Sequence, residues 1–336
     1  MNLKVAIAMS CIASTVMASI MPTQTIYVPP LPDFDLVMSR LPGNCTIQLT
    51  NGVYQTGGNT KWRPKSGQTI IGAGMTNTII QLTNATDCIT DSRSNQSITL
   101  SDLTLDCNHL AVSGVYFHGS GNKIHNVRLI NADNLSTGPY RESFGILIAP
   151  VLFPVGLSNE ISDCVVSNYT MSGINNQTAI DIVGDGSRLL RNHVFGDTNN
   201  PVFGFTLSGK DCLMESNLTV GCDLGYHSDT PDGTTNLTVD GNQFIGCRIA
   251  YFVANSTNYN TRILSNRMEF SSIGIKFEAP CAVIGCSIIG NQPVPTSSSI
   301  NFMFLNGVHG LIAYDNYSTT NLFYNCDFTN VPVNKR

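Results

Sequence analysis

Five ionisable side chains recur at matching places in the second half of this chain, although charged residues make up only 12% of its 336 residues. Alignment of the short apolar segments that open on glycine or alanine brings together Asp181, His227, Asp229, Lys276 and Glu278. Two carboxylates about 5 to 10 Å apart can supply the acid and the base or nucleophile of glycosidic hydrolysis. A histidine or lysine can instead remove a proton from carbon, if a cation neutralises the neighbouring anion. The residue types therefore predict acid–base chemistry.

The two reactions use these residues differently. Hydrolysis would pair Asp181 with Asp229 or with Glu278. Elimination would use His227 or Lys276 as the base, and a calcium ion held by Asp229 and Glu278 is the one cofactor that we consider. Outward Asp, Lys and Glu on a strand are most often plain solvated residues, so a face without any catalytic role is the alternative.

Further residues are candidates for contact with a substrate, because aromatic rings stack on sugars and the other side chains are polar neighbours of the five. Some share the aligned positions, and two stand just before an aligned strand: Tyr116, His118, Arg141, Glu142, Thr206 and Phe252.

A repeat of about 25 residues has to position these side chains. The segments that begin at Asn217, Asn242 and Asn266 resemble one another, and the asparagines are 25 and 24 residues apart. A fixed period of this size is typical of a solenoid, in which each coil packs only against its neighbours. The coils consist of short strands and turns without helical periodicity. The sequence therefore predicts an all-β fold, a single-stranded parallel β-helix.

Alternation within the aligned strands separates inner from outer positions. The second and fourth positions are mostly apolar, as in Ile180 with Ile182 and Ile275 with Phe277, so we expect them to face the core. The third and fifth positions, which hold the five ionisable residues, then form two outward columns. Because neighbouring coils lie about 4.8 Å apart, His227 should lie roughly 10 Å from both Asp181 and Lys276.

Composition excludes some classes of partner. The net charge of −5 and the absence of a basic cluster argue against nucleic acid, which needs concentrated Lys and Arg. A hydrophobic content of 42% is sufficient for a core and excludes a disordered chain.

The N-terminal 18 residues have the pattern of a secretory signal, with one basic residue followed by a short apolar stretch. They are too short for a membrane span, so we expect a secreted or surface-exposed protein. A retained strand that caps the solenoid is the alternative. We then expect a lead-in segment and cap at 19–43 with a short helix from Asp35 to Leu41, the β-helix at 44–330 and a tail at 331–336.

Eleven cysteines are present, and two of them, Cys222 and Cys247, occupy the same place in successive repeats. The spacing of stacked strands would allow a disulfide between them. Buried free thiols are the other interpretation, and the pairing stays open.

The N-terminal half resembles a known group of proteins. The order of a short helix, NGVYQT (51–56), SGQTIIGAGMTNTIIQL (66–82) and ITLSDLTLDCN (98–108) resembles the beginning of right-handed parallel β-helix proteins of the pectate-lyase-like superfamily. The resemblance covers about residues 31 to 330 and implies a right-handed helix with a capping helix. That superfamily includes lyases, glycoside hydrolases, epimerases, tailspikes and adhesins. The residue series of polygalacturonases is absent as a set, and only Ile275-Lys276 matches a fragment of it.

These observations support two hypotheses. The first is a polysaccharide lyase or glycosidase that binds a glycan along the outward columns. The second is a non-catalytic adhesin, attachment module or fibre subunit. In either case the chain could form a homotrimer, with the outward apolar residues Leu147, Phe252, Met303 and Leu305 at the interface.

Overall fold

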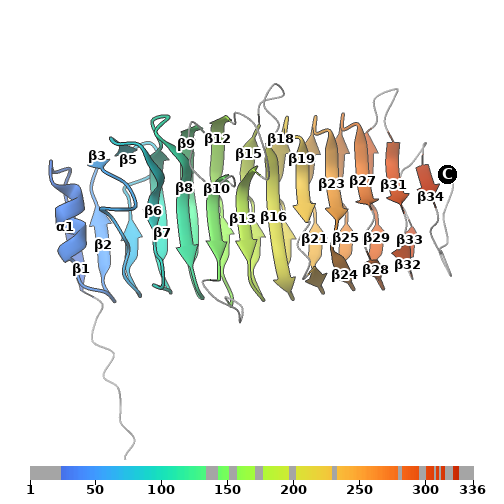
Figure 1. Cartoon of the computed structure of the whole chain (residues 1–336), viewed down its shortest axis with the longest axis horizontal. Coiled ribbons are helices and arrows are strands. Elements are labelled where there is room, and N and C mark those ends of the chain that lie inside the picture. Colours follow the sequence, from blue (N-terminus) through green and yellow to red (C-terminus); the bar gives the residue numbers. More distant parts are fainter. Residues whose placement is uncertain are drawn as a thin grey trace, which may run out of the picture.

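The computed structural model describes residues 24–133, 143–150, 157–170, 177–196, 202–228, 233–278, 282–294, 300–305, 308–309, 312–314 and 321–324. Within these ranges the chain forms one helix, α1 (Phe34–Arg40), and parallel strands that wind as a long coil (Figure 1). The parallel β-helix that the repeat predicted is confirmed.

Three sheets run along the coil. In the first two sheets each strand pairs with its equivalent in the next coil. Two bent strands, β7 (Thr99–Asp106) and β9 (Lys123–Asp133), belong to both of these sheets and join them. Sheet I contains β1 (Thr25–Val28), β2 (Thr46–Leu49), β4 (Thr69–Ile71), β11 (Glu160–Ser162), β14 (Arg188–Leu190), β17 (Leu213–Glu215), β21 (Thr238–Asp240), β25 (Arg262–Leu264), β29 (Ser287–Ile289) and β33 (Ile312–Tyr314). Sheet II contains β3 (Gly52–Thr56), β5 (Thr78–Leu82), β12 (Val165–Thr170), β15 (His193–Phe195), β18 (Leu218–Val220), β22 (Gln243–Ile245), β26 (Arg267–Glu269) and β30 (Gln292–Val294).

Sheet III carries most of the side chains singled out above and faces the viewer in Figure 1. It contains β6 (Thr86–Asp91), β8 (Ala111–His118), β10 (Ser143–Ala149), β13 (Gln177–Val183), β16 (Phe203–Lys210), β19 (Leu224–Ser228), β23 (Ile249–Ala254), β27 (Ile273–Glu278), β31 (Ile300–Leu305) and β34 (Asn321–Tyr324). A short row continues from the end of β16 with β20 (Thr234–Thr235), β24 (Thr257–Tyr259), β28 (Ala282–Ile284) and β32 (Val308–His309).

The core fills the space between the three sheets. The second and fourth positions of the aligned strands are buried as predicted: Ile180, Ile182, Phe205 and Leu207 have no exposed surface. Tyr226 and Tyr251 also point inward, and their rings stack with centroids 4.6 Å apart. Neighbouring coils approach so closely that a Cβ at Gly225 would lie 2.5 Å from the carbonyl oxygen of Ala250. This close approach explains why the aligned strands open on a small residue.

The repeated asparagines form a ladder inside the turn between sheets I and II. Asn217 donates its Nδ2 to Oδ1 of Asn242 at 2.9 Å, and Asn242 donates to Asn266 in the same way at 2.9 Å. The ladder runs from Asn192 to Asn291, and both of these end residues are fully buried. A buried amide needs partners for every polar atom, and the ladder supplies them from coil to coil.

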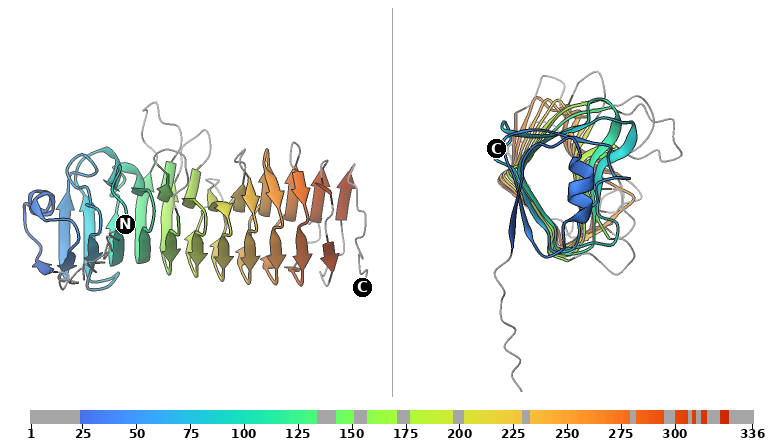
Figure 2. Two further views of the ribbon diagram at one scale, coloured as in Figure 1. Left: turned by 90° about the horizontal axis from the view of Figure 1, so that it is seen from below. Right: turned by 90° about the vertical axis from the view of Figure 1, so that its left-hand side faces the viewer.

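The N-terminal end is covered by α1, which lies across the opening of the coil (Figure 2). Phe34 of this helix packs edge-on against Tyr54 and Trp62, with ring centroids 5.3 Å away in both cases. Asp35 accepts hydrogen bonds from Thr56 and Gly57 and so ties the helix to β3. The predicted capping helix is confirmed. Strand β1, which the proline-rich lead-in did not suggest, pairs with β2 and extends sheet I to its edge.

Candidate functional site: the outward column of sheet III

The outward column predicted from the alignment exists. Direct strand partners include Tyr116 with Leu147, Leu147 with Asp181, and Asp181 with Thr206. The pairing of Phe205 with Tyr226 puts the next residues of β16 and β19, Thr206 and His227, in the same line. His227 then pairs with Phe252, and Phe252 with Lys276. We call Asp181, Thr206, His227, Phe252 and Lys276 the polar column.

The polar column is more buried than an open strand face. Asp181 and His227 are each 6% exposed, and Thr206 is 5% exposed. Phe252 and the side chain of Lys276 are half-buried, the latter 15% exposed. The accessible part of the column therefore lies toward its C-terminal side, over β23 and β27.

An aromatic stack holds the histidine in place. The imidazole of His227 lies between the rings of Phe203 and Phe252, with centroids 4.8 and 5.6 Å away. Lys276 places its ammonium 5.3 Å from the centroid of the Phe252 ring, a cation–π distance. The same ammonium lies 2.7 Å from Oε2 of Glu278. The ring of Phe252 thus lies between an acid–base group, His227, and a cation, Lys276.

The carboxylates are distributed differently from what hydrolysis needs. Asp181 lies on β13 and Glu278 on β27, four strand spacings apart, which corresponds to about 19 Å. The pairing of Asp181 with Glu278 as acid and base is therefore wrong, because both mechanisms of glycoside hydrolysis need carboxylates within about 10 Å. The roughly 10 Å predicted from His227 to Asp181 and to Lys276 agrees with two strand spacings in each direction.

A contact between a carboxylate and a histidine at the N-terminal end of the same face was not predicted. Asp91 on β6 pairs in register with Tyr116 and lies 3.4 Å from Nε2 of His118. Burial opposes ionisation of Asp91, but the hydrogen bonds from His118 and from the backbone N–H of Arg93 bring the pKa of this carboxyl below its usual value. The ring of Tyr116 covers His118 at 4.3 Å between centroids. Nε2 of His118 therefore faces Asp91. The alignment began at the strand that contains His118, and extending it by one coil would have included Asp91.

Some predicted residues lie outside the part of the chain that the structure describes: Asp229, Arg141, Glu142, the 18-residue leader and the tail. The calcium site that would use Asp229 thus stays a prediction. Among the described residues there is no group of three or more His, Cys, Asp or Glu side chains placed to hold a metal ion. Leu147 was predicted to be exposed at a trimer interface. This prediction is wrong, because Leu147 is only 4% exposed.

No helix within the described ranges has the length and apolar character that crossing a bilayer requires. The described cysteines are free and buried, including Cys222 and Cys247. This agrees with the interpretation of that pair as stacked thiols.

Comparison with known proteins supports the fold. No protein family model matches the chain, and no curated protein matches its sequence. Among solved structures, the A-module of the mannuronan C-5 epimerase AlgE4 of Azotobacter vinelandii superposes with a TM-score of 0.60 at 15% identity, over 90% of this chain and 94% of that one. The endo-xylogalacturonan hydrolase of Aspergillus tubingensis gives a TM-score of 0.61 at 10% identity, over 88% and 100% of the two chains.

A third similar structure is that of a tailspike. The Dettilon tailspike protein superposes with a TM-score of 0.51 at 13% identity, over 83% of this chain and 62% of that one. At such low identities these likenesses concern the fold alone. The chain therefore has the fold of these structures, a right-handed parallel β-helix, as the N-terminal segments implied.

Proposed function

We propose that this right-handed parallel β-helix protein binds a uronic-acid polysaccharide along the polar column and cleaves it by elimination. The arrangement of His227, Phe252 and Lys276 is the observation that carries the proposal. It combines a proton acceptor, an apolar surface for a sugar ring and a cation for an acid group, all in line along the coil. The similar structures of a mannuronan C-5 epimerase and an endo-xylogalacturonan hydrolase support the choice of substrate class.

In this proposal His227 removes the proton at C5 of a uronic acid unit. The electron pair forms a double bond between C4 and C5, the C4–oxygen bond breaks, and the departing sugar oxygen takes a proton from water. Lys276 faces the acid groups of the bound chain, and Phe252 packs on a sugar face. Phe203 and Phe252 restrict the rotation of the imidazole, which keeps the base oriented.

Elimination fits the described residues better than hydrolysis does. Asp181 is the one carboxylate of the polar column itself, and Glu278 is too far from it to act with it. Glu278 is moreover engaged by Lys276. A calcium ion would serve the same purpose as Lys276, and the carboxylates of Asp229 and Glu278 would supply its oxygen ligands.

A panel of pectate, alginate, glycosaminoglycans, fructans and neutral glucans tests the proposal, with and without calcium. Ultraviolet absorbance of an unsaturated product from a uronate polymer would support elimination. New reducing ends without that absorbance would show hydrolysis and would contradict the role of His227 as a carbon base. No product from any polymer would move the function to binding without cleavage.

Binding without cleavage is the second candidate, and a specific observation favours it. Asp181 and His227 are each only 6% exposed, so little of either side chain is open to a substrate. A tailspike-like attachment module would need the face only as a glycan contact, and the similarity to the Dettilon tailspike supports this class. Such a module would be indifferent to removal of His227 and sensitive to Phe252→Ser.

A further inference from the structure

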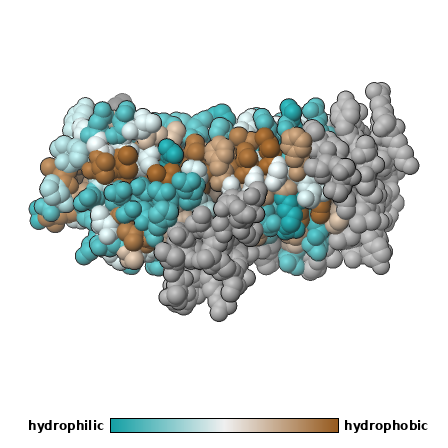
Figure 3. Space-filling view, turned by 90° about the horizontal axis from the view of Figure 1, so that it is seen from above, coloured by the Kyte–Doolittle hydropathy of each residue, from teal (hydrophilic) through white to brown (hydrophobic). Residues whose placement is uncertain are grey.

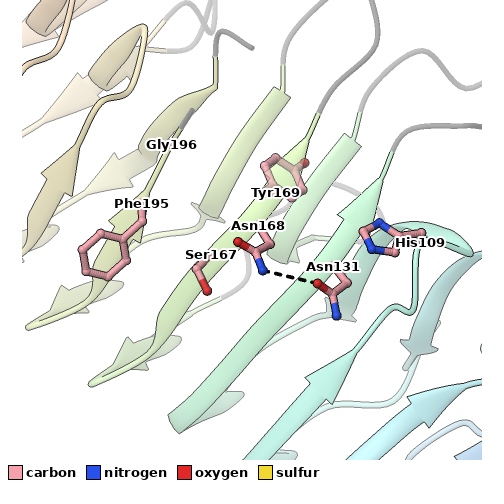
Figure 4. A pocket seen from close by; sticks show the side chains of 7 residues that line it. All are labelled: His109, Asn131, Ser167, Asn168, Tyr169, Phe195 and Gly196. Atoms are coloured by element: carbon pink, nitrogen blue, oxygen red, sulfur yellow. Dashed lines mark hydrogen bonds between the residues drawn. The ribbon is translucent and has the colours of Figure 1, made fainter. Parts of the chain in front are cut away.

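A cleft lies on sheet II, away from the polar column. Its volume is about 430 Å³, and it is lined by Asn131, Ser167, Asn168, Tyr169 and Phe195 (Figure 4). Ligand pockets for small molecules usually measure about 300 to 1,000 Å³, so the space suits one or two sugar rings. We call it the Phe195 cleft.

A step between neighbouring strands forms the cleft. Strands β9 and β12 run on past Asn131 and Asn168 and remain paired through Tyr169 with Ala132. Strand β15, the next along the coil, already ends at Phe195. Asn131 and Asn168 have φ angles of 56° and 52°, the left-handed conformation, in the middle of their strands. Asparagine is one of the few non-glycine residues that adopt this conformation readily.

Hydrogen bonds fix the amides that face the cleft. Asn131 donates its Nδ2 to Oδ1 of Asp106 at 2.8 Å. Its Oδ1 in turn accepts a hydrogen bond from Nδ2 of Asn168 at 3.4 Å, the dashed line in Figure 4. The amide of Asn168 remains exposed, and its oxygen and its second N–H are left as an acceptor and a donor for a ligand.

The lining combines an apolar ring with polar groups that carry no charge. Phe195 is 40% exposed beside the exposed Asn168 and the half-buried Ser167. Among the described lining residues no side chain bears a carboxylate, ammonium or guanidinium group, and His109 supplies the one imidazole. An aromatic ring with a few fixed polar groups is the lining that sugars need, a ring to stack on and donors and acceptors for hydroxyls.

Charge decides between neutral and acidic sugars. Asp106, 8% exposed, lies behind Asn131, and its other oxygen accepts a hydrogen bond from Gln81 at 2.9 Å. Its negative charge opposes an anionic ligand, and no cation among the described lining residues offsets it. We propose that the Phe195 cleft binds neutral sugar units. This is a second glycan site, on sheet II rather than sheet III, and its ligand class rests on its own lining rather than on the proposed elimination.

Two sites of different preference would suit a polysaccharide that carries both acidic and neutral units. The surface of the molecule seen from above is a mixture of hydrophobic and hydrophilic patches along the axis (Figure 3). Phe270, an exposed phenylalanine on the loop after β26, is 57% exposed and also has a positive φ, 54°. It does not line the cleft and therefore provides a matched control for Phe195.

Isothermal titration calorimetry of the full chain with cellotetraose, xylotetraose, mannotetraose and galactotetraose tests the inference. We expect one of these neutral oligosaccharides to bind, and Phe195→Ala to weaken the binding about tenfold or more. Asn168→Asp keeps a residue that tolerates positive φ but removes the side-chain N–H donor, so it should also weaken binding. Phe195→Trp, which keeps an aromatic ring, and Phe270→Ala, which lies outside the cleft, should not weaken it. Thermal unfolding checks that each variant is folded.

The outcomes separate this inference from the proposed function. Neutral-sugar binding that is lost in Phe195→Ala but kept in His227→Gln supports the cleft, whether or not the chain cleaves uronates. Binding that is lost in His227→Gln and kept in Phe195→Ala belongs to the polar column and overturns the cleft. Absence of binding by all four oligosaccharides overturns it as well, even if elimination of uronates is observed.

Discussion

The imidazole of His227 lies parallel to the ring of Phe252, with 5.6 Å between the centroids and 5° between the planes. The two residues are direct partners in neighbouring parallel strands, 25 positions apart in the chain. A parallel ladder aligns equivalent positions on top of one another, so the fold itself produces this stack. The stack holds the proposed base beside the proposed sugar-binding ring.

Replacement of the base should abolish turnover without unfolding the protein. We expect His227→Gln to lower kcat about 10²- to 10⁴-fold on the uronate polymer that the wild type cleaves, because this is the usual contribution of general base catalysis. The formation of unsaturated product measures the effect. His125→Gln, which changes a histidine on sheet I with a half-exposed side chain, is the control. Equal activity in both variants would exclude His227 as the base.

The ion pair between Lys276 and Glu278 predicts two changes of opposite sign. Lys276→Met should weaken binding of an acidic oligosaccharide, since the cation is lost. Glu278→Gln should strengthen it, because this change removes the carboxylate that lies 2.7 Å from the ammonium. Each effect should be about two- to fivefold and should shrink at high salt, as expected of a partly exposed pair. Calorimetry at two salt concentrations measures both, and a shift in the same direction for the two variants would contradict the assignment.

Interruption of the asparagine ladder should destabilise the coil. Asn242→Ala would leave the backbone N–H of Asn217 without its acceptor and the carbonyl of Met214 without its side-chain donor, whereas Oδ1 of Asn266 would keep the hydrogen bond from the backbone N–H of residue 242. We expect a loss of about 2 to 4 kcal/mol in the free energy of unfolding. Urea unfolding compares this variant with Gln243→Ala, whose side chain is exposed on the next position. A cost similar to that of the control would show that the ladder contributes little.

Acid should reveal the contribution of an ion pair on the outside of the turn between sheets I and II. Arg191 donates two hydrogen bonds of 2.7 Å to Asp163. These bonds are the main reason why the pKa of Asp163 lies below its usual value; partial burial opposes them, and the charges of Arg191, His125 and His193 assist. Because the folded pKa is lower than the unfolded one, the carboxylate stabilises the fold fully above about pH 4, and this stabilisation is lost as the pH falls through the folded pKa.

Asp163→Asn should therefore lower the urea midpoint at pH 7. The difference in midpoint from the wild type should shrink as the pH falls and should disappear once Asp163 is protonated in the folded wild type. Unfolding series at pH 7, 5 and 3 measure this. A difference that grows as the pH falls would contradict the lowered pKa.

The described cysteines should resist modification in the folded protein. Burial raises the pKa of Cys164 to about 12 and that of Cys212 and Cys286 to about 11, so little thiolate forms at neutral pH. Iodoacetamide followed by peptide mass spectrometry should label these three only after denaturation. The peptides with Cys222 and Cys247 should be labelled after denaturation without a reductant. A requirement for a reductant would instead show a disulfide between them.

The sequence by itself determined the coil and its inner and outer faces. These properties follow from a period of about 25 residues and from alternation along a strand, and both are local patterns. For the same reason the alignment placed Asp181, His227 and Lys276 in one outward column at the correct spacing. The absence of the polygalacturonase residue series as a set is likewise a property of the sequence alone.

Only the tertiary structure decided which of these residues can act together. Asp91 joins His118 from a strand that the alignment had not included. Burial was also beyond the sequence, since an outward position such as Leu147 or His227 is exposed only if nothing else covers it. The Phe195 cleft depends on where neighbouring strands end and on two left-handed asparagines. Strand ends and backbone conformations of this kind depend on contacts between coils, which no single repeat encodes.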